Sequence, residues 1–270
     1  MRIAISNLAW PADQEEVALK LVVAAGFDGV EVAPQKTFGA WSEWTAWRPR
    51  EYRARLEAMG LRIPALQAIL FGMKDCELFV SAGTRANLRA HLGNVAVLAG
   101  ELGAHACVYG APKTRDPGKL PAEEAWRIAV DFFAGVAPLF AAAGTALAFE
   151  ANPPAYDCRF VTGTAESCRL VKDIGRPGIG VNVDGGTISL NHESMEEVAA
   201  AGPRAVHFHA SEPHLVPLGS TGTDHVALAA ALAAGGYQGW CSAEMRTDDD
   251  WQANVRRAGQ LLRDSYAARD

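Results

Sequence analysis

The sequence predicts a (β/α)8 barrel, with residues 1–270 forming one domain. Eight short runs rich in β-branched and aliphatic residues recur along the chain, and segments with helical spacing of apolar residues lie between them. No linker rich in Pro, Gly or Ser interrupts this alternation, and α/β barrels commonly reach about 250 residues as one unit. A doubly wound open sheet is the alternative, but residues 7–11 after the first run lack the glycine-rich turn of a dinucleotide site.

Each predicted element has its own local signal. The strand-like runs are residues 2–10, 29–34, 61–69, 105–110, 145–151, 178–184, 205–211 and 239–245. Apolar residues with helical spacing at 15–25, 87–102, 122–143 and 251–267 predict helices there. A glycine stands just before five of the strands, where a helix would need a C-terminal cap: Gly26, Gly60, Gly103, Gly144 and Gly236.

Composition and charge exclude several classes of protein. The chain is 49% hydrophobic and 21% charged, which is typical of a globular protein and not of a disordered one. Its net charge of -6, without a stripe of Lys or Arg, argues against a nucleic-acid partner. The five cysteines form no CxxC pair and indicate reduced thiols, so we expect a cytoplasmic protein. No uninterrupted apolar run approaches 18 residues and the N-terminal segment does not read as a signal peptide, so we expect no membrane partner.

Four ionisable residues stand at or near the ends of the last four predicted strands: Glu150, Asp184, His209 and Glu244. In a barrel of this kind, catalytic groups come from these strand ends. Side chains alternate along a strand, so each of the four shares its face with a small or polar residue two positions earlier: Ala148, Asn182, His207 and Ser242. The alternation therefore aims all four groups into the mouth of the barrel.

Three carboxylates beside one imidazole predict a divalent metal ion, because closely spaced carboxylates repel one another unless a cation lies between them. The mixed oxygen and nitrogen donor set suits Mn2+, Co2+ or Mg2+, and Zn2+ is a further candidate. The absence of thiolate argues against a closed structural zinc site. The alternative for each residue is an ordinary polar side chain that hydrogen-bonds a loop.

The motifs AFE150ANPP, VNVD184GGT, H207FH209ASE212P and SAE244MR, in this order, resemble the xylose isomerase-like TIM barrel superfamily of sugar phosphate isomerases and epimerases. The similarity runs from Ile3 to the last helix. It implies that Glu150, Asp184, His209 and Glu244 bind the metal, and that Glu150 and Glu244 are the acid/base pair. Two positions depart from many members: Thr187 replaces a substrate-contacting histidine and Glu212 replaces an aspartate. These departures bear on the substrate.

The expected activity is therefore a metal-dependent isomerisation or epimerisation of a sugar or sugar phosphate, by proton transfer next to a carbonyl through a metal-stabilised enediolate. An inosose dehydratase-like lyase on the same metal site, or a noncatalytic sugar-binding barrel, is the alternative. An endonuclease IV-like phosphodiesterase would need a histidine-rich zinc cluster and a basic face, which the sequence lacks. The sugar, its phosphorylation, the native metal and a homo-oligomeric state stay open.

Further residues are candidates around this site. Sugar hydroxyls are expected to contact side chains at strand ends or nearby, namely Asn7, Gln67, Tyr109, Asn152, His225 and Arg246, and Glu31 is a further candidate. Arg246 has an ion pair with Glu244 as its alternative role, and Asp224 is expected to cap the helix that His225 begins. We expect His207 and Glu212 to support the metal ligands from behind.

Two loops carry unusual compositions. Trp41, Trp44 and Trp47 follow the second strand at three-residue spacing and predict packing in a lid or a subunit contact. The loop after the fourth strand carries a small basic cluster, which is either a solvated face or a phosphate contact: Lys113, Arg115 and Lys119.

Overall fold

The computed structural model, described for residues 1–41 and 47–267, has eight parallel strands in the order β2-β1-β8-β7-β6-β5-β4-β3. Isolated bridges from Gly29 to Arg62 and from Val32 to Leu66 bring the two edge strands together, so the sheet forms a nearly closed barrel. The predicted fold class is confirmed. The strands are β1 (Arg2–Ser6), β2 (Gly29–Glu31), β3 (Ala65–Leu66), β4 (Ala106–Tyr109), β5 (Ala146–Glu150), β6 (Ile179–Asp184), β7 (Ala205–Ser211) and β8 (Trp240–Glu244).

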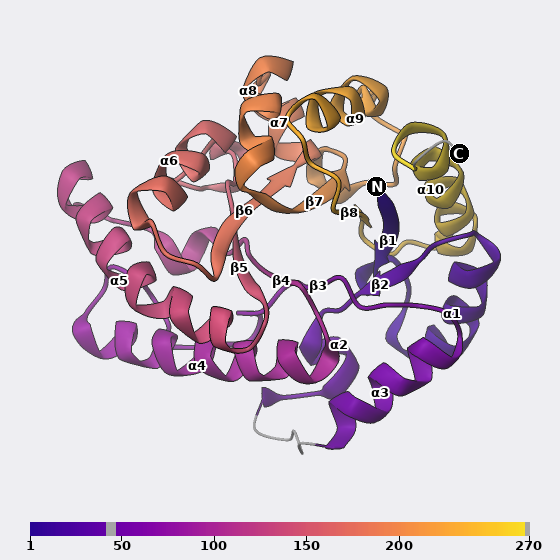
Figure 1. Ribbon diagram of the computed structural model, residues 1–270, viewed down its shortest axis with the longest axis horizontal. Helices are drawn as coiled ribbons and strands as arrows, with labels where there is room; N and C mark the ends of the chain where they lie inside the picture. The colour runs from indigo at the N-terminus through magenta and orange to yellow at the C-terminus, as the bar shows by residue number, and fades with distance from the viewer. Residues whose placement is uncertain (42–46, 268–270) are drawn as a thin grey trace.

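Helices surround the barrel, as seen along its axis in Figure 1. The predicted helices at 15–25, 87–102, 122–143 and 251–267 are all present, and the second begins five residues earlier than expected, behind a Ser81 capping box. The glycines predicted to end helices have positive φ; Gly103, at φ 71°, caps α4. The helices are α1 (Glu15–Ala24), α2 (Pro34–Phe38), α3 (Trp47–Ala58), α4 (Ala82–Leu102), α5 (Ala122–Ala142), α6 (Thr164–Ile174), α7 (Gly185–Asn191), α8 (Met195–Ala201), α9 (His225–Ala234) and α10 (Trp251–Ser265).

The third strand is much shorter than the predicted run of residues 61–69. Only Ala65 and Leu66 pair as a strand, with Ala106 and Cys107 of β4. Pro64 lacks the N–H that a regular ladder requires, and its carbonyl accepts hydrogen bonds from the N–H groups of both His105 and Ala106. On its other side, isolated bridges and not a regular ladder connect this segment to β2, so the barrel is irregular between β2 and β3.

The helix α5 is the one helix of the described chain that is long and apolar enough to cross a membrane, by length and composition alone. In the barrel its apolar side is buried, with Phe133 and Phe140 fully enclosed. Its outer side carries an ion pair of 3.3 Å between Arg127 and Asp131. We attribute its hydropathy to packing against the sheet, and the absence of a membrane partner stays a prediction.

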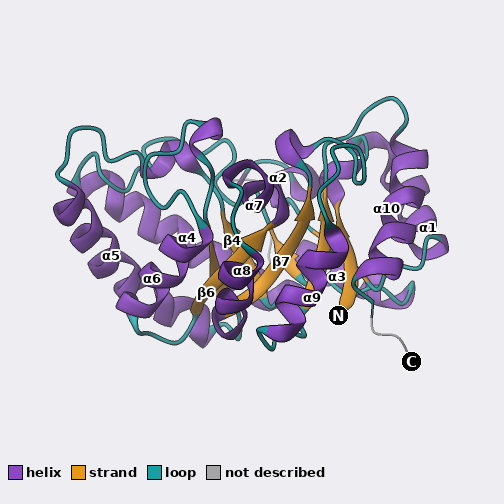
Figure 2. Cartoon of the chain, turned by 90° about the horizontal axis from the view of Figure 1, so that it is seen from above, coloured by secondary structure: helices purple, strands orange, loops and turns teal. Residues whose placement is uncertain are grey.

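Two apolar layers support the site. Most of the buried apolar residues form one cluster between the strands and the helices. It includes the residues that directly precede Glu150, Asp184, His209 and Glu244, namely Phe149, Val183, Phe208 and Ala243. Inside the barrel a second, small cluster contains Ala65, Ala106, Val108 and Ala148. Figure 2 shows the strands pointing toward the end where α2 and α7 and many of the loops lie. The carboxyl ends of β5 to β8, with their ionisable residues, lie at that end.

Candidate metal centre

The four predicted metal ligands meet at the carboxyl ends of β5 to β8. One ligand atom from each of Glu150, Asp184, His209 and Glu244 lies within 4.8 Å of the other three. The strand register produces this meeting, because Asp184 pairs with His209 across β6 and β7, and Glu244 pairs with Ser211 across β7 and β8. The alternation seen in the sequence therefore correctly placed all four side chains on one side of the sheet.

His209 lies at the centre of the group and is nearly inaccessible to solvent. Its Nδ1 atom lies 3.1 Å from Glu150 Oε1 and 3.1 Å from Glu244 Oε2. Its other ring nitrogen, Nε2, lies 2.9 Å from Glu31 Oε1. An ionised carboxylate only accepts hydrogen bonds, so Glu31 requires a proton on Nε2. Nδ1 is therefore the nitrogen that faces the carboxylates and is available to a cation.

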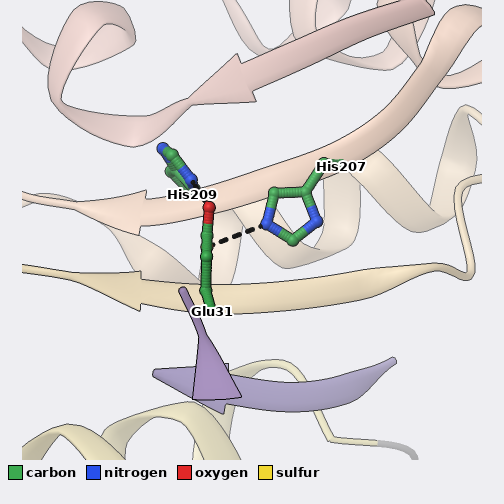
Figure 3. Close-up of side chains that lie close together, drawn as sticks. All are labelled: Glu31, His207 and His209. Carbon is green, nitrogen blue, oxygen red and sulfur yellow. Dashed lines mark hydrogen bonds and ion pairs between the residues drawn. The ribbon is translucent and has the colours of Figure 1, made fainter. Parts of the chain in front are cut away.

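Glu31 joins the two histidines of β7, as the close-up in Figure 3 shows. Its side chain is fully buried, and Oε2 lies 3.1 Å from His207 Nε2. Burial by itself would raise the pKa of Glu31, but the charges of His209 and His207 and their hydrogen bonds outweigh burial and hold that pKa far below its usual range. Glu31 is thus the buried acceptor that orients both rings.

The role of Glu31 was not predicted from the sequence, which suggested a sugar contact. Glu31, His207 and His209 also have the composition of a metal group. The carboxylate, however, lies between the two Nε2 atoms at hydrogen-bonding distances. We interpret this second cluster as support for His209. The available signal was a glutamate at the end of a fully buried strand, which needs partners inside the protein.

Asp184 both ends β6 and caps the helix α7. Its Oδ1 atom accepts a hydrogen bond of 2.6 Å from the backbone N–H of Thr187, and its Oδ2 atom accepts one from the Ser211 hydroxyl. Burial, followed by the charges of Glu150 and Glu244, raises the pKa of Asp184 to about 7. Thr187 donates its hydroxyl proton to the carbonyl of Ala151 at 3.1 Å and is buried.

Glu150 is held on several sides. Asn182 Nδ2 donates to Glu150 Oε1 at 2.6 Å, and Asn152 Nδ2 donates to Oε2 at 3.1 Å. A Cβ atom at Gly110, directly after β4, would lie 2.0 Å from Glu150 Oε2, so any larger residue there would displace the Glu150 carboxylate from its present position. Burial would raise the pKa of Glu150, but hydrogen bonds and the charge of His209 lower it. The pKa of Glu244 is raised, chiefly by burial.

These charges fit a divalent cation. Burial would lower the pKa of His209, yet the charges of Glu31 and Glu244 raise it well above the usual range. The protein thus favours positive charge at the position of Nδ1, between the two glutamates. Three carboxylates and one imidazole supply four hard or borderline donors, which is the donor set expected for Mn2+, Co2+, Mg2+ or Zn2+.

The predicted sugar-binding residues of the first half of the barrel do not all face the mouth. Asn7 is fully buried and ties β1 to α2: its Oδ1 accepts from the N–H of Ala33 and its Nδ2 donates to Thr37. Tyr109 packs among the aromatic rings of the helix layer, because Ala106 and Val108 take the inner face of β4. Neither position suits a sugar contact. Gln67 donates to the Ser6 hydroxyl, and its buried Oε1 has no partner within the described residues.

In the second half of the barrel, two predicted site residues make contacts other than the expected ones. The buried Glu212 carboxylate accepts from the N–H of Gly219 at 2.7 Å and the hydroxyl of Thr223 at 2.6 Å, so it organises a loop instead of backing the metal ligands. His225 is buried and contacts Glu212 and Tyr266, so its position does not match the sugar contact that was expected for it. Asp224 caps α9 as predicted.

His207 and His209 contact the same Glu31 carboxylate, and the supporting role of His207 stays a prediction. Arg246 is exposed near the mouth. Among the described residues Glu244 forms its ion pair with His209 and not with Arg246. The amide of Asn152 donates a hydrogen bond to Glu150 and accepts one from Arg115.

The residues singled out in the two loops differ in their exposure to solvent. Lys113 and Lys119 are exposed, whereas Arg115 is fully buried, so the three do not form one basic cluster. Trp41 packs edge-on against His91 of α4 with ring centroids 4.3 Å apart, and Trp47 is exposed at the start of α3. Trp44 lies outside the described residues.

The chain belongs to the Xylose isomerase-like TIM barrel family, whose sequence profile matches residues 19–265. This agrees with the resemblance carried by the strand-end motifs. No curated protein sequence matches the chain.

Solved structures of similar shape are sugar epimerases and related proteins. D-psicose 3-epimerase with D-tagatose, from Clostridium cellulolyticum H10, has a TM-score of 0.85 at 17% identity, covering 99% of this chain and 100% of that one. The 3-keto-D-glucoside 4-epimerase YcjR from E. coli has a TM-score of 0.79 at 18% identity, covering 98% and 99%. The IOLI protein with a bound zinc atom has a TM-score of 0.75 at 15% identity, covering 98% and 96%. At these identities the likeness establishes the fold.

Proposed function

We propose that this protein is a divalent-metal-dependent isomerase or epimerase of a sugar or sugar-like substrate. Glu150, Asp184, His209 and Glu244 would hold one metal ion, and Glu150 and Glu244 would be the catalytic acid and base. Mn2+, Co2+ and Mg2+ are the proposed metals, with Zn2+ as a further candidate. The similar structures of epimerases solved with D-tagatose, D-fructose and D-allulose support a small sugar as the partner.

One observation carries the proposal: Glu150 and Glu244 approach the same nitrogen of His209 from two different strands, each at 3.1 Å. The two carboxylates, which come from β5 and β8, therefore lie close to one point at the barrel mouth. Their side chains keep 10% and 14% of their exposure, against 1% for His209, so a substrate entering from the mouth meets the glutamates first.

The chemistry follows from this pair. The four residues would hold a divalent cation that, when bound, would act as a Lewis acid beside the substrate carbonyl and would acidify the neighbouring C–H group. One glutamate can then remove that proton, and the other can return a proton from the opposite side. Return to the same carbon inverts its configuration, whereas return to the adjacent carbon exchanges an aldose for a ketose.

The proposal is tested by turnover of a panel of ketoses, aldoses and their phosphates in D2O with Mn2+. An isomerase or epimerase should place deuterium at the carbon next to the carbonyl whenever the abstracted proton exchanges with solvent. A lyase on the same metal site would instead release water and leave an unsaturated or diketo product. A noncatalytic barrel would bind a sugar without exchanging any hydrogen, and that result would refute the proposal.

A further inference from the structure

Arg115 is a fully buried cation behind the candidate catalytic site. Its guanidinium donates to neutral oxygen acceptors: the carbonyls of Phe160 at 3.1 Å, Tyr109 at 3.2 Å and Glu150 at 2.8 Å, and Oδ1 of Asn152 at 2.7 Å. It also stacks on the ring of Phe149, 5.0 Å from the centroid. A buried charge is costly unless its hydrogen bonds are well made, so this arrangement needs a reason beyond filling space.

The contact with Asn152 provides that reason. Asn152 is itself buried, and its Nδ2 atom donates to Glu150 Oε2 at 3.1 Å. A guanidinium only donates and a carboxylate only accepts. Arg115 therefore requires the oxygen of the Asn152 amide to face it, which turns the NH2 group toward Glu150. Without Arg115 the amide would be free to flip and to present its oxygen to the carboxylate.

We infer that Arg115 is a positioning residue that fixes the carboxylate of Glu150 through Asn152. It also holds the backbone of Glu150 directly, through the carbonyl at the end of β5. The loop after β4 thus builds one wall of the Glu150 site, with Gly110 leaving room for the carboxylate and Arg115 setting its orientation. This role replaces the phosphate contact that the sequence suggested for Arg115.

The inference rests on the proposed function, because it assigns Glu150 a role in metal binding and proton transfer. Its test is the affinity for Mn2+ alone, measured by titration calorimetry on the whole protein, together with the melting temperature. Asn152→Ala is the decisive variant, since Arg115 keeps its three carbonyl acceptors and the barrel should stay folded. We expect the affinity for Mn2+ to fall by about 10- to 100-fold, as for other supporting contacts of metal ligands.

Arg115→Lys and Arg115→Met extend the test. Lysine keeps one charge but cannot make the forked contacts, so Arg115→Lys should bind Mn2+ more tightly than Arg115→Met and less tightly than the wild type. Arg159→Met is the matched control, because Arg159 lies nearby, pairs with Asp116 and is 57% exposed. That control should leave the affinity for Mn2+ unchanged.

The outcomes separate the two proposals. If Asn152→Ala melts at a lower temperature but binds Mn2+ as tightly as the wild type, Arg115 is a structural clamp and the inference is wrong. A wild type that binds no Mn2+ would overturn the inference together with the metal site. A wild type that binds Mn2+ but converts no sugar would refute the proposed function, and the variant affinities would still decide the role of Arg115.

Discussion

Glu31 Oε1 lies 2.9 Å from His209 Nε2, so a glutamate from the second strand determines which nitrogen of a seventh-strand histidine faces the metal group. The same carboxylate accepts from His207 at 3.1 Å. A histidine that binds a metal through one nitrogen usually donates its other N–H to such an acceptor, which raises its basicity and fixes its ring. Glu31 therefore connects the half of the barrel that carries no proposed metal ligand with the half that carries all four.

Glu31→Gln should weaken the binding of Mn2+ by about 10- to 100-fold. Glutamine has a single acceptor oxygen and would present an NH2 group to one of the two histidine donors, so at least one ring must turn. Titration of the purified variant with Mn2+ measures the change. Glu212→Gln is the control, because Glu212 is a buried carboxylate that contacts His225 and not the metal group. Equal affinities in Glu31→Gln and the wild type would contradict this role.

Asp184→Ala and His209→Ala should each lose most of the bound metal, since removal of one ligand opens the site. Metal analysis of protein purified with excess Mn2+ measures occupancy, with about one ion per chain expected for the wild type. A chelator should abolish activity, and Mn2+, Co2+ or Mg2+ should restore it better than Ca2+, which prefers more ligands. Full occupancy in both variants would show that the metal binds elsewhere.

Glu150→Gln and Glu244→Gln should each lower turnover by at least about 10²-fold, because the amide keeps the shape but cannot take a proton. Comparing deuterium wash-in with net conversion should show which glutamate acts on which face of the substrate. Glu123→Gln, on the exposed first turn of α5, is the control and should behave as the wild type. Near-normal turnover of both site variants with metal bound would refute the two-glutamate mechanism.

The affinity for Mn2+ should rise with pH through the neutral range. Burial and neighbouring carboxylates raise the pKa of Asp184 to about 7, and Glu31 and Glu244 raise the pKa of His209 well above its usual value. Both groups hold protons in the metal-free protein below these values, and binding must release them. Calorimetry in buffers with different ionisation enthalpies counts the released protons. An affinity that does not change between about pH 6 and 8 would contradict the expectation.

Glu212→Gln should destabilise the fold without affecting the metal. The wild-type carboxylate accepts charge-assisted hydrogen bonds from Gly219 and Thr223, each contributing about 1.5–3 kcal/mol. Although burial opposes it, hydrogen bonding lowers the pKa of Glu212 to about 2, so its stabilisation is present above the pKa of the unfolded chain and is lost as pH falls toward 2. Urea unfolding at pH 7 and pH 3 should show a gap between wild type and variant that narrows at the lower pH.

The barrel and its four proposed ligands were predictable because both depend on local periodicity. Parallel strands end on the same side of a sheet, and side chains alternate along each strand. The sequence of β5 to β8 therefore determined that Glu150, Asp184, His209 and Glu244 would meet, as they do. The helix ends were also set locally, by residues such as Gly103, whose left-handed conformation stops α4.

The contacts that hold these ligands depend on packing between distant parts of the chain. Glu31 contacts His207 across 176 positions of the chain, and Arg115 reaches Glu150 and Asn152 from a loop on another strand. Tyr109 was expected at the barrel mouth because it ends β4, but Val108 occupies the inner face of that strand. A hydrogen bond joins whichever donor and acceptor the packed chain brings within about 3 Å, and no periodicity in the sequence records that choice. The sequence thus determined which side chains reach the barrel mouth. Packing determined which hydrogen-bond partner each side chain has and which of its atoms carries a proton.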